Sequence, residues 1–194
     1  VGAFYTRVHQ EEGVEIKTSL MAAEIIGSNR VEAVICNTGE RIEADLLIIG
    51  IGVAPNTELA MDAGLTVDNG ILVDEYAQTS DPNIVAAGDC TNHPNPLLGR
   101  NIRLESVPNA TEQSKSAAAS MCGVEKPYSA LPWFWSDQFD LKLQIAGLNH
   151  GFDQVIIRGD IEKSRSFVAW YLKNSQLIAA DCVNRPKEFM IAKQ

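Results

Sequence analysis

The stretch "PWFWSDQF", residues 132–139, places three large rings side by side: Trp133, Phe134 and Trp135. Successive side chains of a β-strand point to opposite faces, so a strand here puts Trp133 and Trp135 on one face and Phe134 on the other. We expect Phe134 to fill the core of a small domain and Trp133 to pack at the domain seam near Pro132. Trp135 is then left to contact something other than that core.

The residues that follow are typical of short antiparallel strands joined by tight turns. Lys173-Asn174-Ser175 is the tightest of these turns, and Asn184-Arg185-Pro186 predicts the start of a final helix. The strands that we expect are Leu141–Ala146, Gln154–Arg158, Phe167–Leu172 and Leu177–Cys182. This part of the chain is predicted to form a small antiparallel α+β domain.

The residues before this stretch have a different pattern, which indicates an α/β fold. Phe4 and Val8, followed by Gly13, predict the end of an amphipathic helix. The expected strands are Val14–Ile16, Leu20–Ile26, Val31–Cys36 and Ala44–Ile49, with a turn at Asn37-Thr38-Gly39 and two further short strands in "GILVD" and "NIVAAGDC". The run from Leu46 to Ile49 is apolar on both faces, as in a buried parallel strand.

The charge of the chain excludes some partners. It holds 16 Lys and Arg against 25 Asp and Glu, a formal net charge of −9, so nucleic acid is a poor partner. Residues 1–136 hold 8 Lys and Arg against 18 Asp and Glu, whereas residues 137–194 hold 8 against 7. The last third therefore presents either ordinary solvated charge or a basic face for an acidic protein.

The cysteines, histidines and apolar runs argue against a metal-binding or membrane protein. The four cysteines lie far apart without a C-x-x-C pair, and the three histidines have no ligand spacing, so we expect no metal site. No apolar run reaches the ~20 residues that span a bilayer, and no signal peptide opens the chain, so we expect no membrane partner and a cytoplasmic location. The chain begins at Val1 inside a predicted helix, which suggests a piece of a longer protein.

Two short motifs follow predicted strands. "GIGVAP", residues 50–55, begins like a G-x-G-x-x-G dinucleotide fingerprint, but Pro55 replaces the third glycine, so a tight turn is the better interpretation. "IVAAGDC", residues 84–90, places Gly88 and Asp89 at the carboxyl end of an apolar strand, where open α/β folds bind ligands. From spacing alone, Asp89 either accepts hydrogen bonds from sugar-like hydroxyls or caps the next turn.

A helix is predicted after Ser106, its N-cap, with Pro108 in the first turn. Its first N–H groups, from Val107 and Asn109, and its partial positive charge favour an anion or an electron-rich carbonyl. Alanines along the helix also allow close packing, which is the structural alternative.

Four segments together resemble a known family: "ADLLIIGIGVAPNTELA", "NIVAAGDC", "RLESVPNATEQ" and "PWFWSDQFDLKLQIAGL". They are similar to the FAD-dependent NADH:ferredoxin reductases that serve bacterial cytochrome P450 and aromatic-ring dioxygenase systems. The similarity covers nearly the whole chain in the family's order. "PWFWSDQ" is its most specific motif, while "AAGDC" is shared with a wider group of flavoproteins that have two dinucleotide-binding domains.

The resemblance implies a domain plan. Residues 1–49 are the end of the NADH-binding domain, residues 50–121 the returning part of the FAD-binding domain, and residues 122–194 the C-terminal domain. The implied fold class is the tail of a two-dinucleotide-binding-domain flavoprotein, α/β, followed by a small antiparallel α+β domain. Because the family's amino-terminal half carries both glycine-rich fingerprints, this chain alone is expected to bind FAD and NADH weakly or not at all.

The resemblance also implies roles for five residues. Gly88 is part of the cofactor site, Asp89 touches the ribityl–phosphate part of FAD, and the Val107 backbone N–H meets the pyrimidine end of the isoalloxazine. Glu105 lies toward the nicotinamide side, and Trp135 packs beside the flavin. No residue is expected to act as a catalytic acid or base, because FAD itself passes electrons from NADH to a [2Fe–2S] ferredoxin.

Two alternatives stay open. The isolated chain is either part of such an enzyme or a non-catalytic fragment that acts as an interaction module. The second alternative keeps the enzyme class but changes the electron acceptor to oxygen, a peroxide or a disulfide, as in related NADH oxidases and disulfide reductases. The tryptophan-rich motif favours the ferredoxin reductases.

Overall fold

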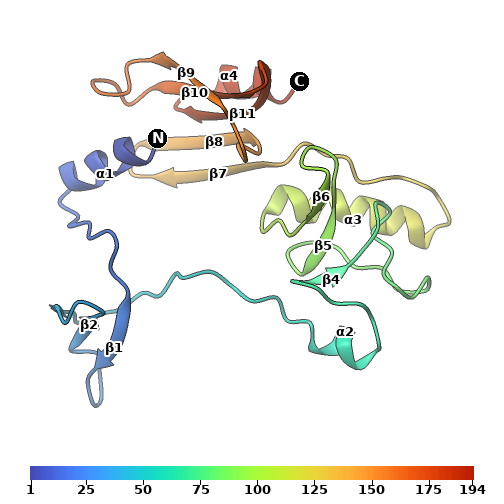
Figure 1. Cartoon of the computed structure of the whole chain (residues 1–194), viewed down its shortest axis with the longest axis horizontal. Coiled ribbons are helices and arrows are strands. Elements are labelled where there is room, and N and C mark those ends of the chain that lie inside the picture. Colours follow the sequence, from blue (N-terminus) through green and yellow to red (C-terminus); the bar gives the residue numbers. More distant parts are fainter. The chain divides into compact units, whose positions relative to one another are not determined.

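The structure, a computed structural model, describes all residues, 1–194 (Figure 1). The chain divides into two compact units, Val1–Val53 and Ala54–Gln194. No helix in the chain has both the length and the apolar character that a membrane crossing requires. The predicted fold class, α/β followed by a small antiparallel α+β domain, is confirmed.

The first unit consists of a helix and a three-stranded antiparallel sheet. Helix α1 spans Gly2–Glu11 and buries Phe4 and Val8, as their spacing predicts. The strands are β1 (Ala22–Ile26), β2 (Ala33–Cys36) and β3 (Arg41–Glu43), in the order β1-β2-β3. The predicted turn at residues 37–39 joins β2 to β3, where Gly39 has a φ of +86°.

Two predicted strands of this unit are wrong. Residues 14–16 and 44–49 form no strand. Leu46 is 77% exposed and Ile48 is 85% exposed, although the run was expected to be a buried parallel strand. Such a strand is buried only when neighbouring strands pair with it and helices cover it, and no strand of this chain pairs with residues 44–49.

The second unit begins with a small α/β part. It comprises α2 (Glu58–Asp62), β4 (Ile71–Leu72), β5 (Thr91–Asn95), β6 (Arg100–Ile102) and α3 (Val107–Met121). Strand β4 pairs in parallel with β5, and β5 pairs antiparallel with β6.

The predicted strand in "NIVAAGDC" is reduced to one isolated bridge, between Gln78 and Val85. The strand lies further on, in the polar sequence "TNHPN" of β5, whose Thr91 and His93 are fully buried. The hydrophobic pattern did not reveal this strand, because its buried side chains are polar.

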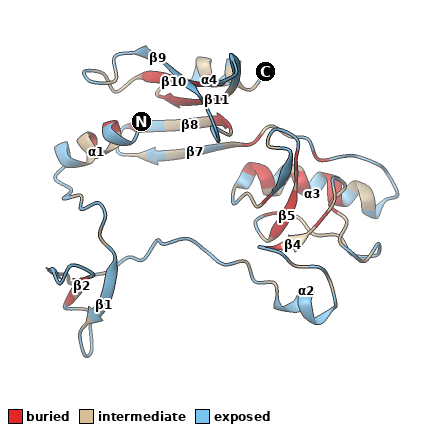
Figure 2. Ribbon diagram, in the orientation of Figure 1, coloured by how far each residue is buried: buried red, intermediate tan, exposed pale blue.

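The unit ends in a five-stranded antiparallel sheet with the order β7-β8-β11-β10-β9. Its strands are β7 (Trp133–Gln138), β8 (Leu141–Gly147), β9 (Gln154–Gly159), β10 (Phe167–Lys173) and β11 (Gln176–Val183). Helix α4 (Pro186–Ala192) packs on β8 and β11, with Phe189 in a core of Ala146, Val168, Ala180 and Cys182. Figure 2 shows the inner strands mostly buried and the edge strand β9 exposed along its length.

His93 of β5 gives a testable pH dependence. His93 is 1% exposed, and its ring meets the Tyr128 ring edge-on with the two ring centroids 5.1 Å apart. Burial lowers the pKa of His93 below its usual 6.5. Between that lowered pKa and 6.5 the unfolded chain binds a proton that the folded chain excludes, so stability is complete above pH 6.5 and falls as the pH drops through this window. The expected slope is at most about 1.4 kcal/mol per pH unit.

Urea unfolding at about pH 7.5 and about pH 5.5 measures this effect. The variant His93→Phe should show a smaller loss of unfolding free energy between the two pH values. An equal loss in both proteins would show that His93 does not cause it.

Candidate functional site

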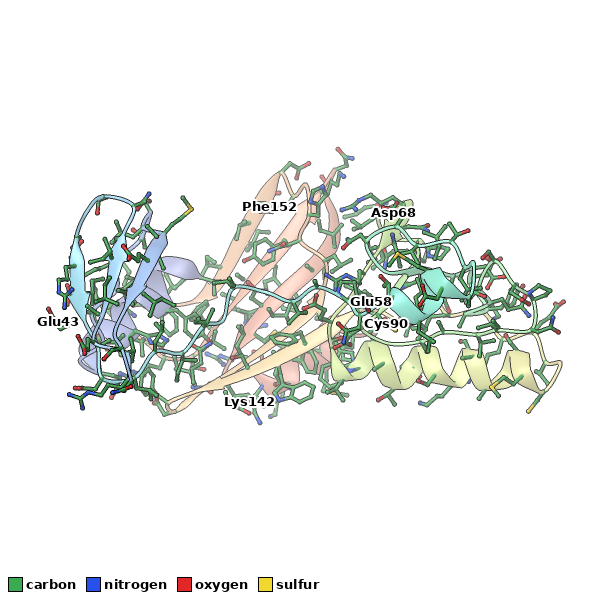
Figure 3. All side chains as sticks on the ribbon, turned by 90° about the horizontal axis from the view of Figure 1, so that it is seen from below. Glu43, Glu58, Asp68, Cys90, Lys142 and Phe152 are labelled. Carbon is green, nitrogen blue, oxygen red and sulfur yellow. The ribbon has the colours of Figure 1, made fainter.

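The turn after residue 87 is built around Gly88, which has a φ of +89° and is buried. This left-handed conformation favours glycine. The Gly88 N–H donates to Oε1 of Gln113 on α3 at 2.8 Å, and Thr91 Oγ1 lies 2.8 Å from the Gly88 carbonyl and 2.9 Å from the same Oε1. The turn is therefore fixed to α3, and Cys90, which follows it, is labelled in Figure 3.

Asp89, the second residue of this turn, is exposed, and its carboxylate accepts no hydrogen bond and forms no ion pair within this chain. A charged group fixed at its backbone but left unpaired is available to a ligand. The position agrees with the expected role of Asp89, which stays a prediction.

Arg103 joins the turn to Glu105, and sequence reasoning missed it. Its Nη1 pairs with Glu105 Oε1 and lies 3.4 Å from the Asp89 carbonyl, while its Nε donates to Asn69 Oδ1 at 3.4 Å. Arg103 and Glu105 are two apart in an extended segment, so they share a side, and this spacing was the available signal. Glu105 and the Gly88–Asp89 turn are thus brought together by one guanidinium.

The start of α3 is held firmly. Ser106 is the N-cap, as predicted, and its Oγ accepts from the Asn109 N–H at 3.3 Å. Asn109 also donates to the Leu104 carbonyl at 3.0 Å and accepts from the Tyr128 hydroxyl at 2.8 Å. Burial, with a smaller effect from Glu112, raises the pKa of Tyr128 to about 12, so this hydroxyl remains a donor.

Of the two amides expected to be available at this helix end, only that of Val107 remains, because Asn109 is occupied by the cap. Val107 is 65% exposed and lies in the first turn, where no helix carbonyl accepts its N–H. The helix dipole places partial positive charge at the same point. This end of α3 can therefore stabilise an electron-rich carbonyl or an anion.

The aromatic strand corrects one prediction and supports another. Trp133 and Trp135 share one face of β7, with ring centroids 5.5 Å apart, as strand alternation predicts. Phe134 was expected in the core but is 46% exposed, because the helix that closes the core covers the opposite face of the sheet. Trp133 packs on Phe189 of that helix at 5.6 Å, whereas Trp135 is 36% exposed.

A pocket of about 180 Å³ lies between the start of α3 and this strand. Glu105 and Ser106 line one side, and Pro132, Trp133 and Phe134 line the other. Trp133 therefore reaches both the core and the seam. Trp135, two residues further along β7, does not line this pocket.

Known proteins match this chain along its whole length. Residues 1–114 match the pyridine nucleotide-disulphide oxidoreductase family, and residues 133–194 match the C-terminal domain described as "Reductase C-terminal". The chain belongs to the pyridine nucleotide-disulphide oxidoreductase family. The second match begins at Trp133, so the aromatic strand opens a recognised reductase domain, and the expected resemblance to FAD-dependent ferredoxin reductases is confirmed.

Individual relatives are similar over the entire chain. Putidaredoxin reductase of Pseudomonas putida is 47% identical over 100% of this chain and 46% of its own length, and rhodocoxin reductase of Rhodococcus erythropolis is 40% identical over 100% and 45%. A covalent putidaredoxin reductase–putidaredoxin complex superposes with a TM-score of 0.93, covering 99% of this chain and 46% of that chain. The chain spans about half the length of these relatives.

The residues of the candidate site fit part of an FAD molecule. The Asp89 carboxylate suits ribityl hydroxyls as a hydrogen-bond acceptor, and the exposed Val107 N–H suits the electron-rich pyrimidine end. The chain offers no G-x-G-x-x-G loop for the pyrophosphate, since Pro55 interrupts its one approximate copy. The fit therefore covers the ribityl and flavin ends of the cofactor.

Proposed function

We propose that this chain is the carboxyl-terminal part of a flavoprotein reductase that passes electrons from NADH through FAD to a [2Fe–2S] ferredoxin. The ferredoxin in turn serves a P450 or a ring-hydroxylating dioxygenase. Names of the relatives support this: they include reductases of putidaredoxin and rhodocoxin and the ferredoxin reductase component of an anthranilate 1,2-dioxygenase system. In the proposed domain plan, residues 1–49, 50–121 and 122–194 belong to the NADH, FAD and C-terminal domains.

One observation carries the proposal. The residues that lead into α3 and the aromatic strand β7 line the same pocket, with Glu105 and the N-cap Ser106 on one side and Trp133 and Phe134 on the other. A helix end that stabilises negative charge thus lies near the exposed Phe134 ring, which a partner protein can reach. This arrangement suits a redox group that must hold electrons and then release them to another protein.

Each residue has a defined task in this proposal. FAD, when bound, accepts two electrons from NADH and releases them singly. Asp89 binds the ribityl hydroxyls, and the Val107 N–H binds the pyrimidine end and stabilises negative charge there. Arg103 positions Glu105 and the Gly88–Asp89 turn relative to each other. Trp135 is 36% exposed on the edge strand β7, where we place the exit of electrons.

The chain alone is expected to retain no stoichiometric FAD through gel filtration, because it lacks the amides that bind the pyrophosphate. Joined to the half of putidaredoxin reductase that it does not cover, it should retain about one FAD per chain, seen as absorbance near roughly 450 nm. We call this joined protein the chimera. Stoichiometric FAD on the isolated chain would contradict the partial site, and a chimera that folds without FAD would contradict the proposed function.

Reduction of an acidic ferredoxin by the chimera should slow as salt rises, because charges are screened over ~8 Å at physiological ionic strength. Lys193 lies over the Trp133 ring, 4.3 Å from its centroid, and so places a cation beside the aromatic strand. Stopped-flow association rates should fall for Lys193→Gln more than for Lys163→Gln, a matched change in the loop after β9. A salt-independent rate would mean that apolar contact, not charge, guides docking.

We also propose a cytoplasmic location. Cys36, Cys90, Cys122 and Cys182 are all free thiols, as in proteins of a reducing compartment.

A further inference from the structure

A second pocket lies next to the pocket between α3 and β7, with which it shares Gly147 and Leu148. It has a volume of about 650 Å³, within the range of small-molecule sites, and separates the loop before β6 from one end of the five-stranded sheet. A neighbouring hollow of about 370 Å³ shares Leu98, Arg100, Leu148 and His150 with it. We call the two together the basic pocket. Leucines make up much of its apolar wall: Leu97, Leu98, Leu131, Leu148 and Leu177.

Three basic side chains from separate segments line the basic pocket. Arg100 begins β6, His150 follows β8, and Lys173 ends β10. Lys173 Nζ lies close to the backbone of Gly151, the residue after His150, because a Cβ built on Gly151 would be only 3.2 Å from this nitrogen. The three groups therefore converge from three segments on one cavity.

No carboxylate balances the positive charges of Arg100 and Lys173. Neither pocket is lined by an aspartate or a glutamate, although the chain has 25 of them and a net charge of −9. Arg100, His150 and Lys173 form no salt bridge, and Arg100 Nη1 donates only to the Asn101 carbonyl, at 3.4 Å. Arg103 also lines the hollow, but it is paired with Glu105. Like charges gathered without a counter-ion favour binding of an anion.

The side-chain oxygen of Asn92 has no hydrogen-bond donor, which adds a second requirement for the ligand. Asn92 lines the hollow and is 7% exposed. Its Nδ2 donates to the carbonyl of Asp68, labelled in Figure 3, at 2.6 Å, but its buried Oδ1 has no hydrogen-bond partner. A buried oxygen without a donor costs free energy unless a ligand supplies one. The ligand should therefore carry a hydroxyl or an amine as well as a negative charge.

We propose that the basic pocket binds a small organic phosphate: an apolar ring-sized body, a phosphate group, and a hydroxyl or amine donor. The phosphate lies among Arg100, His150 and Lys173, the body lies against the leucines, and the donor meets Asn92 Oδ1. Phosphate is favoured over carboxylate because it carries up to two charges and presents three oxygens to three basic groups. The site is separate from Asp89, Val107 and Trp135, none of which lines it.

The test uses the whole chain, 4-aminophenyl phosphate as the probe and titration calorimetry in a phosphate-free buffer. We expect binding tighter than about 1 mM, with phenyl phosphate several-fold weaker and inorganic phosphate at least about tenfold weaker. Arg100→Gln and Lys173→Gln should each weaken the probe about tenfold, as loss of a hydrogen bond between charged groups predicts. Lys163→Gln, an equal charge change outside the pocket, should change the affinity less than about twofold.

NMR signals of the His150 ring give a second readout, assigned with His150→Gln. The probe should shift His150 and leave the buried His93 unmoved. Inorganic phosphate that binds as tightly as the probe, or an equal loss in Lys163→Gln, would overturn the proposal by showing adventitious anion binding only. Displacement of the probe by FAD in the chimera would overturn it by making the pocket part of the flavin site. A ferredoxin that shifts His150 where the probe does not would assign the surface to a protein instead.

Discussion

Trp135→Ala in the chimera is expected to lower NADH-dependent ferredoxin reduction at least about tenfold while ferricyanide reduction is largely retained. Trp135 is 36% exposed at the edge of the sheet, so its ring is available to a partner protein and contributes less to the core than Trp133 does. Ferricyanide is small and reaches the flavin without that ring. Steady-state rates with the two acceptors, measured on the same preparation, give the comparison.

Trp133→Ala is the matched control, because the two rings lie 5.5 Å apart on the same strand. Trp133 packs on Phe189 and the core around it, so its removal should cost about 3 kcal/mol of unfolding free energy. Both activities should then fall together as the sheet loosens. If Trp135→Ala also lowers both activities equally, the ring serves packing and the electron exit lies elsewhere.

Asp89→Ala should lower the FAD affinity of the chimera by about tenfold to a hundredfold, as expected for a hydrogen bond to a charged group worth about 1.5–3 kcal/mol. The carboxylate is exposed and unpaired within this chain, so the urea midpoint of the FAD-free protein should hardly change. Flavin content after dialysis and fluorescence titration of the apoprotein measure the affinity. Asp89→Asn, which keeps an acceptor oxygen, should retain more affinity than the alanine variant.

Glu125→Ala removes another exposed carboxylate of the same unit and serves as the charge control. It should leave the flavin content unchanged. Unchanged content in Asp89→Ala as well would assign Asp89 to the turn alone, which was the alternative that the sequence left open.

Local patterns predicted the elements whose ends are marked by caps and turns. Helix α3 begins after its Ser106 cap as expected, and the four strands after β7 lie within one residue of their expected bounds. The same reasoning failed at Leu46 and Ile48, because an apolar run is buried only if other strands receive it. It also missed β5, where Thr91 and His93 are buried although polar.

In the candidate site, likewise, the sequence predicted only the features that depend on local rules. Gly88 and the Val107 amide follow from local rules about turns and helix ends. Arg103 does not, because its role depends on three partners that only the folded chain brings within reach: Asn69, the Asp89 carbonyl and Glu105. The exposure of Phe134 likewise depends on which face of the sheet α4 covers, and strand alternation alone leaves that choice open.

The central claim is that this chain supplies the part of a reductase that delivers electrons to a ferredoxin. The most direct measurement is NADH-dependent reduction of putidaredoxin by the chimera, followed anaerobically by the loss of the oxidised iron–sulfur absorbance. The account predicts reduction at a rate within about tenfold of putidaredoxin reductase itself, with one NADH consumed for every two ferredoxins reduced. A chimera that binds FAD and oxidises NADH with oxygen or a disulfide, yet leaves putidaredoxin oxidised, would contradict it.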